Sequence, residues 1–259
     1  MSTYSRRKWL VTTATAGAAL STFSLTGAES VEEAEMILIP AGPFLMGTSE
    51  DDVKALAWDY SCDPTWLGGE SPQRSVRLAA FNMDRYPVTN RQYARFCDKA
   101  SHAVPEHWRG PVPPAEILDH PVTYVNRADA RAYAKWAGKR LPTEAEWEKA
   151  ARGTDGLMYP WGNQFDPKAC QWDHTQSQLP TGPTSVKAHP RGASPYGAMD
   201  MVGNAAEWCE DSPGPDSAFI KGGCWLTASP LNLRCAARGM SGHDNNRLAY
   251  IGFRCAKGA

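Results

Sequence analysis

The chain changes character at Gly153, and this change limits the folds that are open to it. Before Gly153, several segments have the caps and the apolar spacing of helices. After it, Gly, Pro and Trp dominate and no long periodic segment remains. Short apolar runs between turn residues predict short strands and loops. We therefore expect the second half to depend on disulfides, ions or aromatic packing for its order.

Each predicted helix in the first part begins after a side chain that can accept a hydrogen bond from the first helical turn. These caps are Ser49, Thr89, Asn126 and Thr143. The first helix is expected over residues 51–58. Thr143 has the clearest signature, because Glu146 follows it at the spacing of a reciprocal capping box. Gly138 is expected to end the helix that begins after Asn126.

Alternating or apolar runs predict the strands. The expected strands are 36–40, 42–47, 75–78 and 83–88. Two more are expected in Ile220–Arg238, where Gly222 and Gly223 let the chain bend before the runs Cys224–Leu226 and Leu231–Ala237. No repeat or inter-domain linker interrupts the sequence, so one domain is expected.

The N-terminal segment has the features of an export signal. Arg6 and Arg7 precede an apolar stretch without acidic residues, and a small-x-small cleavage site fits at Thr26–Ala28. This order is typical of twin-arginine signals, and the apolar part is too short for a transmembrane helix. Residues 1–28 are therefore predicted to be a signal peptide, and residues 29–259 a domain in the periplasm without stable membrane insertion.

The charge balance disfavours nucleic acid as a partner. The chain has 27 basic and 28 acidic residues, and three of the basic ones lie in the predicted signal, which leaves a net charge of −4. A mildly acidic chain without a basic patch is not typical of proteins that bind nucleic acid or anionic membranes. We expect a monomer that acts on a small-molecule or protein substrate in the periplasm.

Sequence blocks spread over residues 36–257 resemble those of one family. They include Pro43–Gly47, Tyr86–Asn90, Trp136–Glu148, Tyr159–Asn163, Tyr196–Gly197, Met201–Trp208, Lys221–Gly223 and Gly252–Arg254. In this order they are similar to the blocks of the formylglycine-generating enzyme (sulfatase-modifying factor) family. The resemblance implies an α+β domain with a compact C-type-lectin-like fold and little regular secondary structure.

The resemblance also implies where the family's copper(I) ion would be bound by two cysteines. The first matching position is Thr227, and the second falls in a shorter loop that reads Pro230–Asn232. Copper(I) prefers soft thiolate ligands, and neither position supplies one. We therefore expect no copper cofactor and no conversion of a sulfatase cysteine to formylglycine.

The candidate catalytic residues are Cys224, Trp225 and Arg238, which lie beside the cleft that the resemblance implies. Cys224 stands where the family usually has a serine. Cys209 precedes this strand, so the two cysteines could form a disulfide or a two-thiol site, or stay as separate buried thiols. A cysteine is structural more often than reactive.

Seven cysteines in an oxidising compartment predict disulfides, and their odd number leaves at least one thiol free. The resemblance implies that Cys235 and Cys255 have lost the partners that the family has at positions 134 and 151, which are Ala134 and Ala151 here. The two cysteines are expected to bridge each other if their Cα atoms lie within about 7 Å.

A calcium site is implied by the resemblance at Asp200, Asn204, Glu207 and the carbonyl of Val202. Hard oxygen ligands from one loop suit calcium, which would have a structural role here. The alternative is a solvated acidic turn.

Two classes of function follow from these observations. The first is an exported oxidoreductase or maturation factor that acts on a periplasmic siderophore precursor or metalloenzyme and is not a true formylglycine generator. The alternative is a non-catalytic lectin-like domain that binds a protein or peptide, since one scaffold can carry different functions.

Overall fold

The computed structural model describes residues 34–173, 182–238 and 240–259, and the predicted signal peptide, residues 1–28, lies outside the described residues. The α-helices are α1 (Glu50–Asp59), α2 (Asn90–Ala100), α3 (Arg127–Trp136) and α4 (Glu144–Arg152). The 3-10 helices are η1 (Pro64–Glu70), η2 (Glu106–Trp108), η3 (Ala115–Ile117), η4 (Pro190–Gly192) and η5 (Pro230–Leu233). No helix of the described part is both long and apolar enough to cross a membrane.

The strands are short and form three sheets. They are β1 (Met36–Ile39), β2 (Gly42–Met46), β3 (Arg74–Leu78), β4 (Phe81–Asp84), β5 (Ala206–Trp208), β6 (Ser217–Lys221), β7 (Met240–His243), β8 (Ile251–Gly252) and β9 (Ala256–Gly258). The strand orders are β1-β4-β9, β2-β3 and β7-β6-β5-β8. Only β5 and β8 pair in parallel among the described strands. Helices and mostly antiparallel sheets confirm the predicted α+β class.

All the predicted helix caps are confirmed. Ser49 accepts a hydrogen bond from the backbone of Asp52, and Thr89, Asn126 and Thr143 each form a reciprocal capping box with the residue three positions on. These caps satisfy backbone N–H groups that have no partner inside the helix. Local sequence therefore fixes where these helices begin.

The four strands predicted between residues 36 and 88 are confirmed in position but not all in length. The consecutive strands β1 and β2 do not pair with each other, because β1 pairs with β4 and β2 pairs with β3. The strand expected over 83–88 ends at Asp84, where the chain turns toward α2.

The stretch Ile220–Arg238 differs most from its prediction. β6 ends at Lys221, and Gly222 and Gly223 take φ values of 92° and 64°, which turn the chain out of the sheet. Neither Cys224–Leu226 nor Leu231–Ala237 is a strand. A Cβ atom at Gly223 would lie 2.9 Å from the side chain of Leu233, so this loop packs directly onto the glycine bend instead of returning to the sheet.

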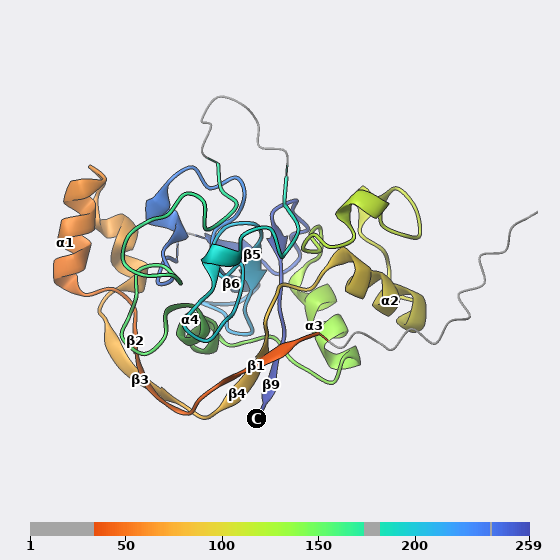
Figure 1. Ribbon diagram of the computed structural model, residues 1–259, viewed down its shortest axis with the longest axis horizontal. Helices are drawn as coiled ribbons and strands as arrows, with labels where there is room; N and C mark the ends of the chain where they lie inside the picture. Colours follow the sequence, from red (N-terminus) through yellow and green to blue (C-terminus); the bar gives the residue numbers. More distant parts are fainter. Residues whose placement is uncertain (1–33, 174–181, 239) are drawn as a thin grey trace, which may run out of the picture. The chain divides into compact units, whose positions relative to one another are not determined.

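Two large hydrophobic clusters and a smaller one around Leu56 and Leu231 form the core of the described part. One surrounds α2 and α3, which pack against each other, and includes Tyr93, Tyr133 and Phe253. The other large cluster surrounds Trp147 of α4, and this helix lies between β2 and β6 (Figure 1).

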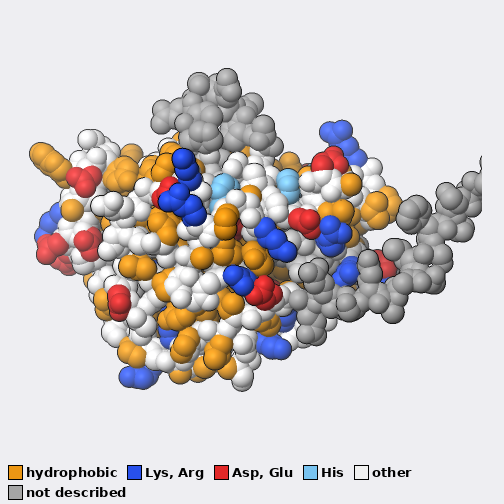
Figure 2. Space-filling model, viewed as in Figure 1, with side chains coloured by type: hydrophobic (Ala, Val, Ile, Leu, Met, Phe, Trp, Pro, Cys, Tyr) orange, Lys and Arg blue, Asp and Glu red, His pale blue; other side chains and the backbone are white. Residues whose placement is uncertain are grey.

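On the surface, Figure 2 shows basic and acidic side chains interspersed over the described part of the face in view.

The predicted disulfides are not formed. All seven cysteines are free, and six of them are buried. Cys255 lies in the cluster that contains Ala134, whereas Cys235 lies in the cluster that contains Ala151. The two C-terminal cysteines therefore pack on different helices and do not bridge. Aromatic packing and buried ion pairs, rather than disulfides, order the second half of the chain.

Cys209 and Cys224 are also unpaired, and both are buried. Cys209 follows β5, and its backbone N–H donates to the carbonyl of Phe219. Cys224 follows β6 beyond the glycine bend and belongs to the other hydrophobic cluster. Of the alternatives for this pair, the structure has separate buried thiols.

Candidate binding site

The three candidate catalytic residues do not converge. Arg238 donates two hydrogen bonds, of 2.6 and 2.5 Å, to the carboxylate of Glu144, and its guanidinium lies 4.9 Å from the ring centroid of Phe219. Its charge is therefore already paired. Cys224 and Trp225 are neighbours in the chain, but their side chains do not line a common cavity. Trp225 lines one of the described cavities, and Cys224 lines none of them.

The thiol of Cys224 lies in the core behind a threonine hydroxyl. The Cys224 N–H donates to Oγ1 of Thr227 at 2.9 Å, and the Sγ atom lies 3.7 Å from the same oxygen. Burial raises the pKa of the Cys224 thiol above its ordinary value. A thiol in this state is protonated at neutral pH, so it is a poor nucleophile and a poor metal ligand.

A cavity of about 210 Å³ lies over the glycine bend. Its walls are Ile220, Gly222, Gly223, Leu226, Thr227, Ala228, Asn232 and Ala237. Thr227 is the first position that the resemblance assigns to a copper ligand, and Asn232 belongs to the shortened loop in which the second one falls. The cavity therefore presents a hydroxyl and an amide where a copper site would need two thiolates.

Trp225 lines a different cavity, of about 330 Å³. Its indole N–H donates to the carbonyl of Ala249 at 3.3 Å. Another wall is formed by the stacked rings of His107 and Tyr124, whose centroids are 4.8 Å apart. Burial lowers the pKa of His107 to about 4, so this imidazole is neutral at physiological pH.

Two of the predicted calcium ligands lie together. The side-chain amide of Asn204 donates to Oδ2 of Asp200 at 2.8 Å, and both residues are buried with left-handed backbone angles, φ 58° and 52°. Burial raises the pKa of Asp200 to about 7. Val202 is buried nearby in the core.

The carboxylate of Glu207, the fourth predicted ligand, pairs with the guanidinium of Arg254. Both of its carboxylate oxygens accept hydrogen bonds from Arg254, each at 2.7 Å, and the indole of Trp147 donates to one of them. No group of three or more His, Cys, Asp and Glu side chains that could hold a metal occurs within the described ranges. As they stand, these side chains do not present a full calcium ligand set, and calcium binding stays a prediction.

Comparison with known proteins decides the family. The sequence model of the family described as the sulfatase-modifying factor enzyme 1-like domain matches residues 22–259. The chain belongs to this family. The formylglycine-generating enzyme of Thermomonospora curvata is 34% identical, with 85% of this chain and 92% of the relative covered. The inactive C-alpha-formylglycine-generating enzyme 2 of Mus musculus is 30% identical, with coverages of 88% and 87%.

Solved structures support the fold in the same way. The structure of PvdO from Pseudomonas aeruginosa is similar with a TM-score of 0.67 at 22% identity, and the match covers 86% of this chain and 94% of that one. The structure of CarF is similar with a TM-score of 0.57 at 17% identity, over 87% and 98% of the two chains. The predicted sulfatase-modifying-factor fold is confirmed.

A buried ionic network next to the glycine bend was missed in the sequence. The Lys221 ammonium lies 3.2 Å from Glu148 and 3.7 Å from Glu144, and Arg152 pairs with Glu148 at 2.9 Å. Glu144, Glu148 and Arg152 follow one another at intervals of four residues in α4, which places them on one face of the helix. This spacing of charged residues was the sequence signal from which the network could have been predicted. In this sulfatase-modifying-factor domain, the network anchors the end of β6, from which the candidate cavity begins.

Proposed function

We propose that this sulfatase-modifying-factor-like protein is exported and binds a segment of a periplasmic substrate or partner in the cavity at Thr227, without oxidising it through copper. The single observation that carries the proposal is the lining of this cavity by Thr227 and Asn232. A hydroxyl and an amide offer donors and acceptors that suit peptide-like polar groups. The family includes relatives named as formylglycine-generating enzymes and relatives named as inactive, so membership leaves the choice to the site.

A second candidate is an oxidoreductase or maturation enzyme that uses Cys224 on a siderophore precursor or a metalloenzyme. The observation in its favour is the 3.7 Å distance from the Cys224 sulfur to the Thr227 hydroxyl that lines the cavity. Burial of the thiol and its raised pKa oppose this role. The binding function is therefore the better supported of the two.

Complementation of a deletion strain distinguishes the two candidates. Ala228 is exposed and lines the cavity, so Ala228→Trp is expected to fill it and abolish complementation. Cys224→Ser is expected to complement fully if the thiol is not used. The readout is the difference in metabolites and periplasmic enzyme activities from the wild type, and Ala103→Trp, at an exposed position outside the described cavities, is the matched control. Loss of function in Cys224→Ser with a native melting curve would favour the oxidoreductase.

The purified, copper-loaded protein supplies a second readout of the same proposal. With a sulfatase-type cysteine peptide under oxygen, no aldehyde product is expected by mass spectrometry, because the cavity has no thiolate pair. The Thermomonospora curvata enzyme is the positive control. Multiple turnovers by this protein would overturn the proposal.

Export is tested by the paired arginines. Changing both Arg6 and Arg7 to Lys is expected to keep the protein in the cytoplasm, because twin-arginine signals depend on this pair. Fractionation followed by immunoblotting measures the distribution, and Lys8→Arg is the matched control. Unchanged periplasmic recovery of the double variant would reject the twin-arginine route.

A further inference from the structure

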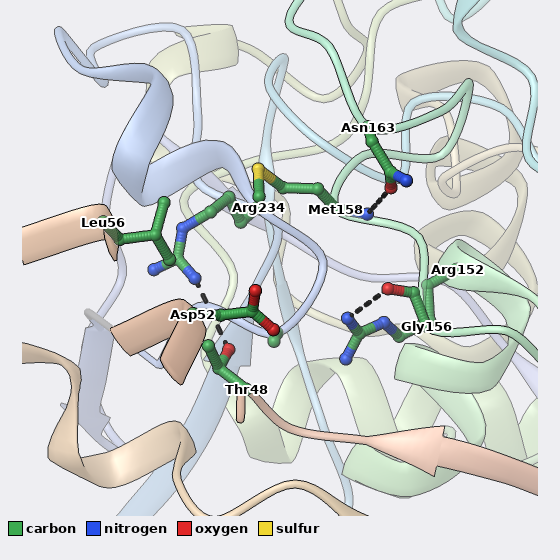
Figure 3. A pocket seen from close by; sticks show the side chains of 9 residues that line it. Thr48, Asp52, Leu56, Arg152, Gly156, Met158, Asn163 and Arg234 are labelled. Atoms are coloured by element: carbon green, nitrogen blue, oxygen red, sulfur yellow. Dashed lines mark hydrogen bonds between the residues drawn. The ribbon is translucent and has the colours of Figure 1, made fainter. Parts of the chain in front are cut away.

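A third cavity, of about 330 Å³, is lined in part by Arg234 and Ala236 and shares no lining residue with the cavity at Thr227 (Figure 3). Its walls come from α1, the end of α4 and the loops around 156–163 and 234–236. The lining residues are Thr48, Asp52, Leu56, Arg152, Gly156, Met158, Asn163, Arg234 and Ala236. The comparisons and the proposed function assign no role to it.

Two buried arginines give one side of this cavity spare hydrogen-bond donors. Arg152 donates to Leu157, Gly47, Gly156 and Glu148, which uses four of its five N–H groups. Each arginine is less than 5% exposed, yet both line the cavity. One N–H of the Arg152 Nη2 atom is left without an acceptor among the described residues.

Arg234 has the same property. Its Nε atom donates to the Leu231 carbonyl, and its two terminal nitrogens donate to the two carboxylate oxygens of Glu70 at 2.9 and 2.6 Å. The Nη1 atom also approaches the Thr48 hydroxyl at 3.5 Å. One Nη2 N–H therefore stays free within the described part of the chain. Two guanidinium groups that line one cavity and each keep a donor are suited to a carboxylate.

The opposite group in this cavity is acidic. Oδ2 of Asp52 accepts a hydrogen bond from Ser49 at 2.6 Å, and Oδ1 has no partner among the described residues. Figure 3 shows the Asp52 carboxylate between the two arginine side chains. Leu56 and Met158 add apolar surface to the wall. A ligand here meets cationic donors, an anionic acceptor and hydrocarbon together.

The charged side chains around the cavity favour one class of ligand over others. The ion pairs that connect to this cavity contain four cations and three carboxylates, namely Arg152, Lys221, Arg234, Arg238, Glu70, Glu144 and Glu148. Asp52 is exposed, so its charge is solvated and does not neutralise this network, which keeps one positive charge in excess. The arginines disfavour a simple cation and the Asp52 carboxylate disfavours a simple anion, whereas a zwitterion can place an opposite charge beside each.

We propose that this cavity binds a small zwitterion of the α-amino-acid type with an aliphatic side chain. The carboxylate of the ligand accepts from the free N–H groups of Arg152 and Arg234. Its ammonium group donates to Oδ1 of Asp52, and its side chain packs on Leu56 and Met158. The inference does not depend on the cavity at Thr227, since the two share no lining residue.

Three probes test this on the full mature chain. L-leucine carries all three groups, 4-methylpentanoate lacks the ammonium, and 3-methylbutylamine lacks the carboxylate. Titration calorimetry and ligand-detected NMR are expected to show binding of L-leucine, and each truncated probe is expected to bind at least about tenfold more weakly, since each lacks a charge-assisted contact. No binding of L-leucine, or equal binding of 4-methylpentanoate, would overturn the proposal.

Variants locate the binding. Asp52→Asn is expected to weaken L-leucine at least about tenfold and to strengthen 4-methylpentanoate, because the repulsion of its carboxylate is removed. The cap of α1 is kept, because the backbone N–H of residue 52 donates to Ser49 Oγ, and Asn still has an oxygen that accepts from the Ser49 hydroxyl. Asp51→Asn is the matched control, because the Asp51 side chain is 93% exposed and does not line the cavity. Equal effects of the two variants on L-leucine, or none from Asp52→Asn, would contradict the assignment.

Discussion

Replacing Arg254 with methionine is expected to lower the free energy of unfolding by about 3–5 kcal/mol, the usual cost of breaking a buried ion pair from one side. Arg254 is 0% exposed, and its guanidinium donates twice to Glu207 and also to the carbonyls of Asp84, Arg85 and Met199. The variant leaves the Glu207 carboxylate buried without its cation and several carbonyls without donors. Urea denaturation at neutral pH measures the loss.

The matched control is Arg131→Met, which breaks an ion pair with Glu210 whose two side chains are 42% and 40% exposed. A surface pair of this kind is worth about 0.2–1 kcal/mol. Adding Glu207→Gln to Arg254→Met is expected to cost less than the sum of the single changes, because the two residues interact directly. Similar denaturation midpoints for Arg254→Met and Arg131→Met would show that the buried pair does not anchor the fold.

Asp200 is expected to make stability depend on pH in the absence of calcium. Its folded-state pKa of about 7 lies above the ordinary value of 3.8, so the folded state favours the protonated form. The contribution is fully present below pH 4 and is lost as the pH rises through 7. Asp200→Asn, which stays neutral, is expected to match the parent near pH 4 and to exceed it by up to about 4 kcal/mol at pH 8.

Adding calcium tests the predicted metal site. If calcium binds at Asp200, it stabilises the ionised carboxylate, so the melting temperature of the parent at pH 8 rises with calcium and falls with chelator. Asp200→Asn is expected to lose this response. A parent whose melting temperature ignores both additions would reject the calcium site. The solvated turn is not the alternative, because Asp200, Asn204 and Glu207 are buried. Stability curves that run parallel from pH 4 to pH 8 would reject the titration of Asp200.

Helices were predictable here because their signals are local. Thr143 and Glu146 satisfy each other within one turn, so the start of α4 is readable without knowledge of its neighbours. The sequence blocks shared with the family predicted the fold and a cleft near Cys224. The first four strands were found by position, but their partners were not, because pairing such as that of β1 with β4 depends on segments distant in the chain.

Tertiary packing explains the errors around the site. Leu231–Ala237 has the apolar content of a strand, but Pro230 begins a 3-10 turn, and the segment packs on the bend at Gly223. The pairing of Arg238 with Glu144 could not be inferred from either local context. The cysteines were assigned to bridges by count and compartment, which say nothing of the separate clusters that hold Cys235 and Cys255.

The three-stranded sheet has a consequence for biosynthesis. β4 lies at its centre, with β1 on one side and β9 on the other, and Phe81 faces Gly258 across the ladder. One side of β4 is therefore paired by residues 256–258. While these residues are still inside the ribosome, the nascent chain exposes β4 as an open edge, which can pair with other strands. This sheet is therefore completed only after residues 256–258 have left the ribosome.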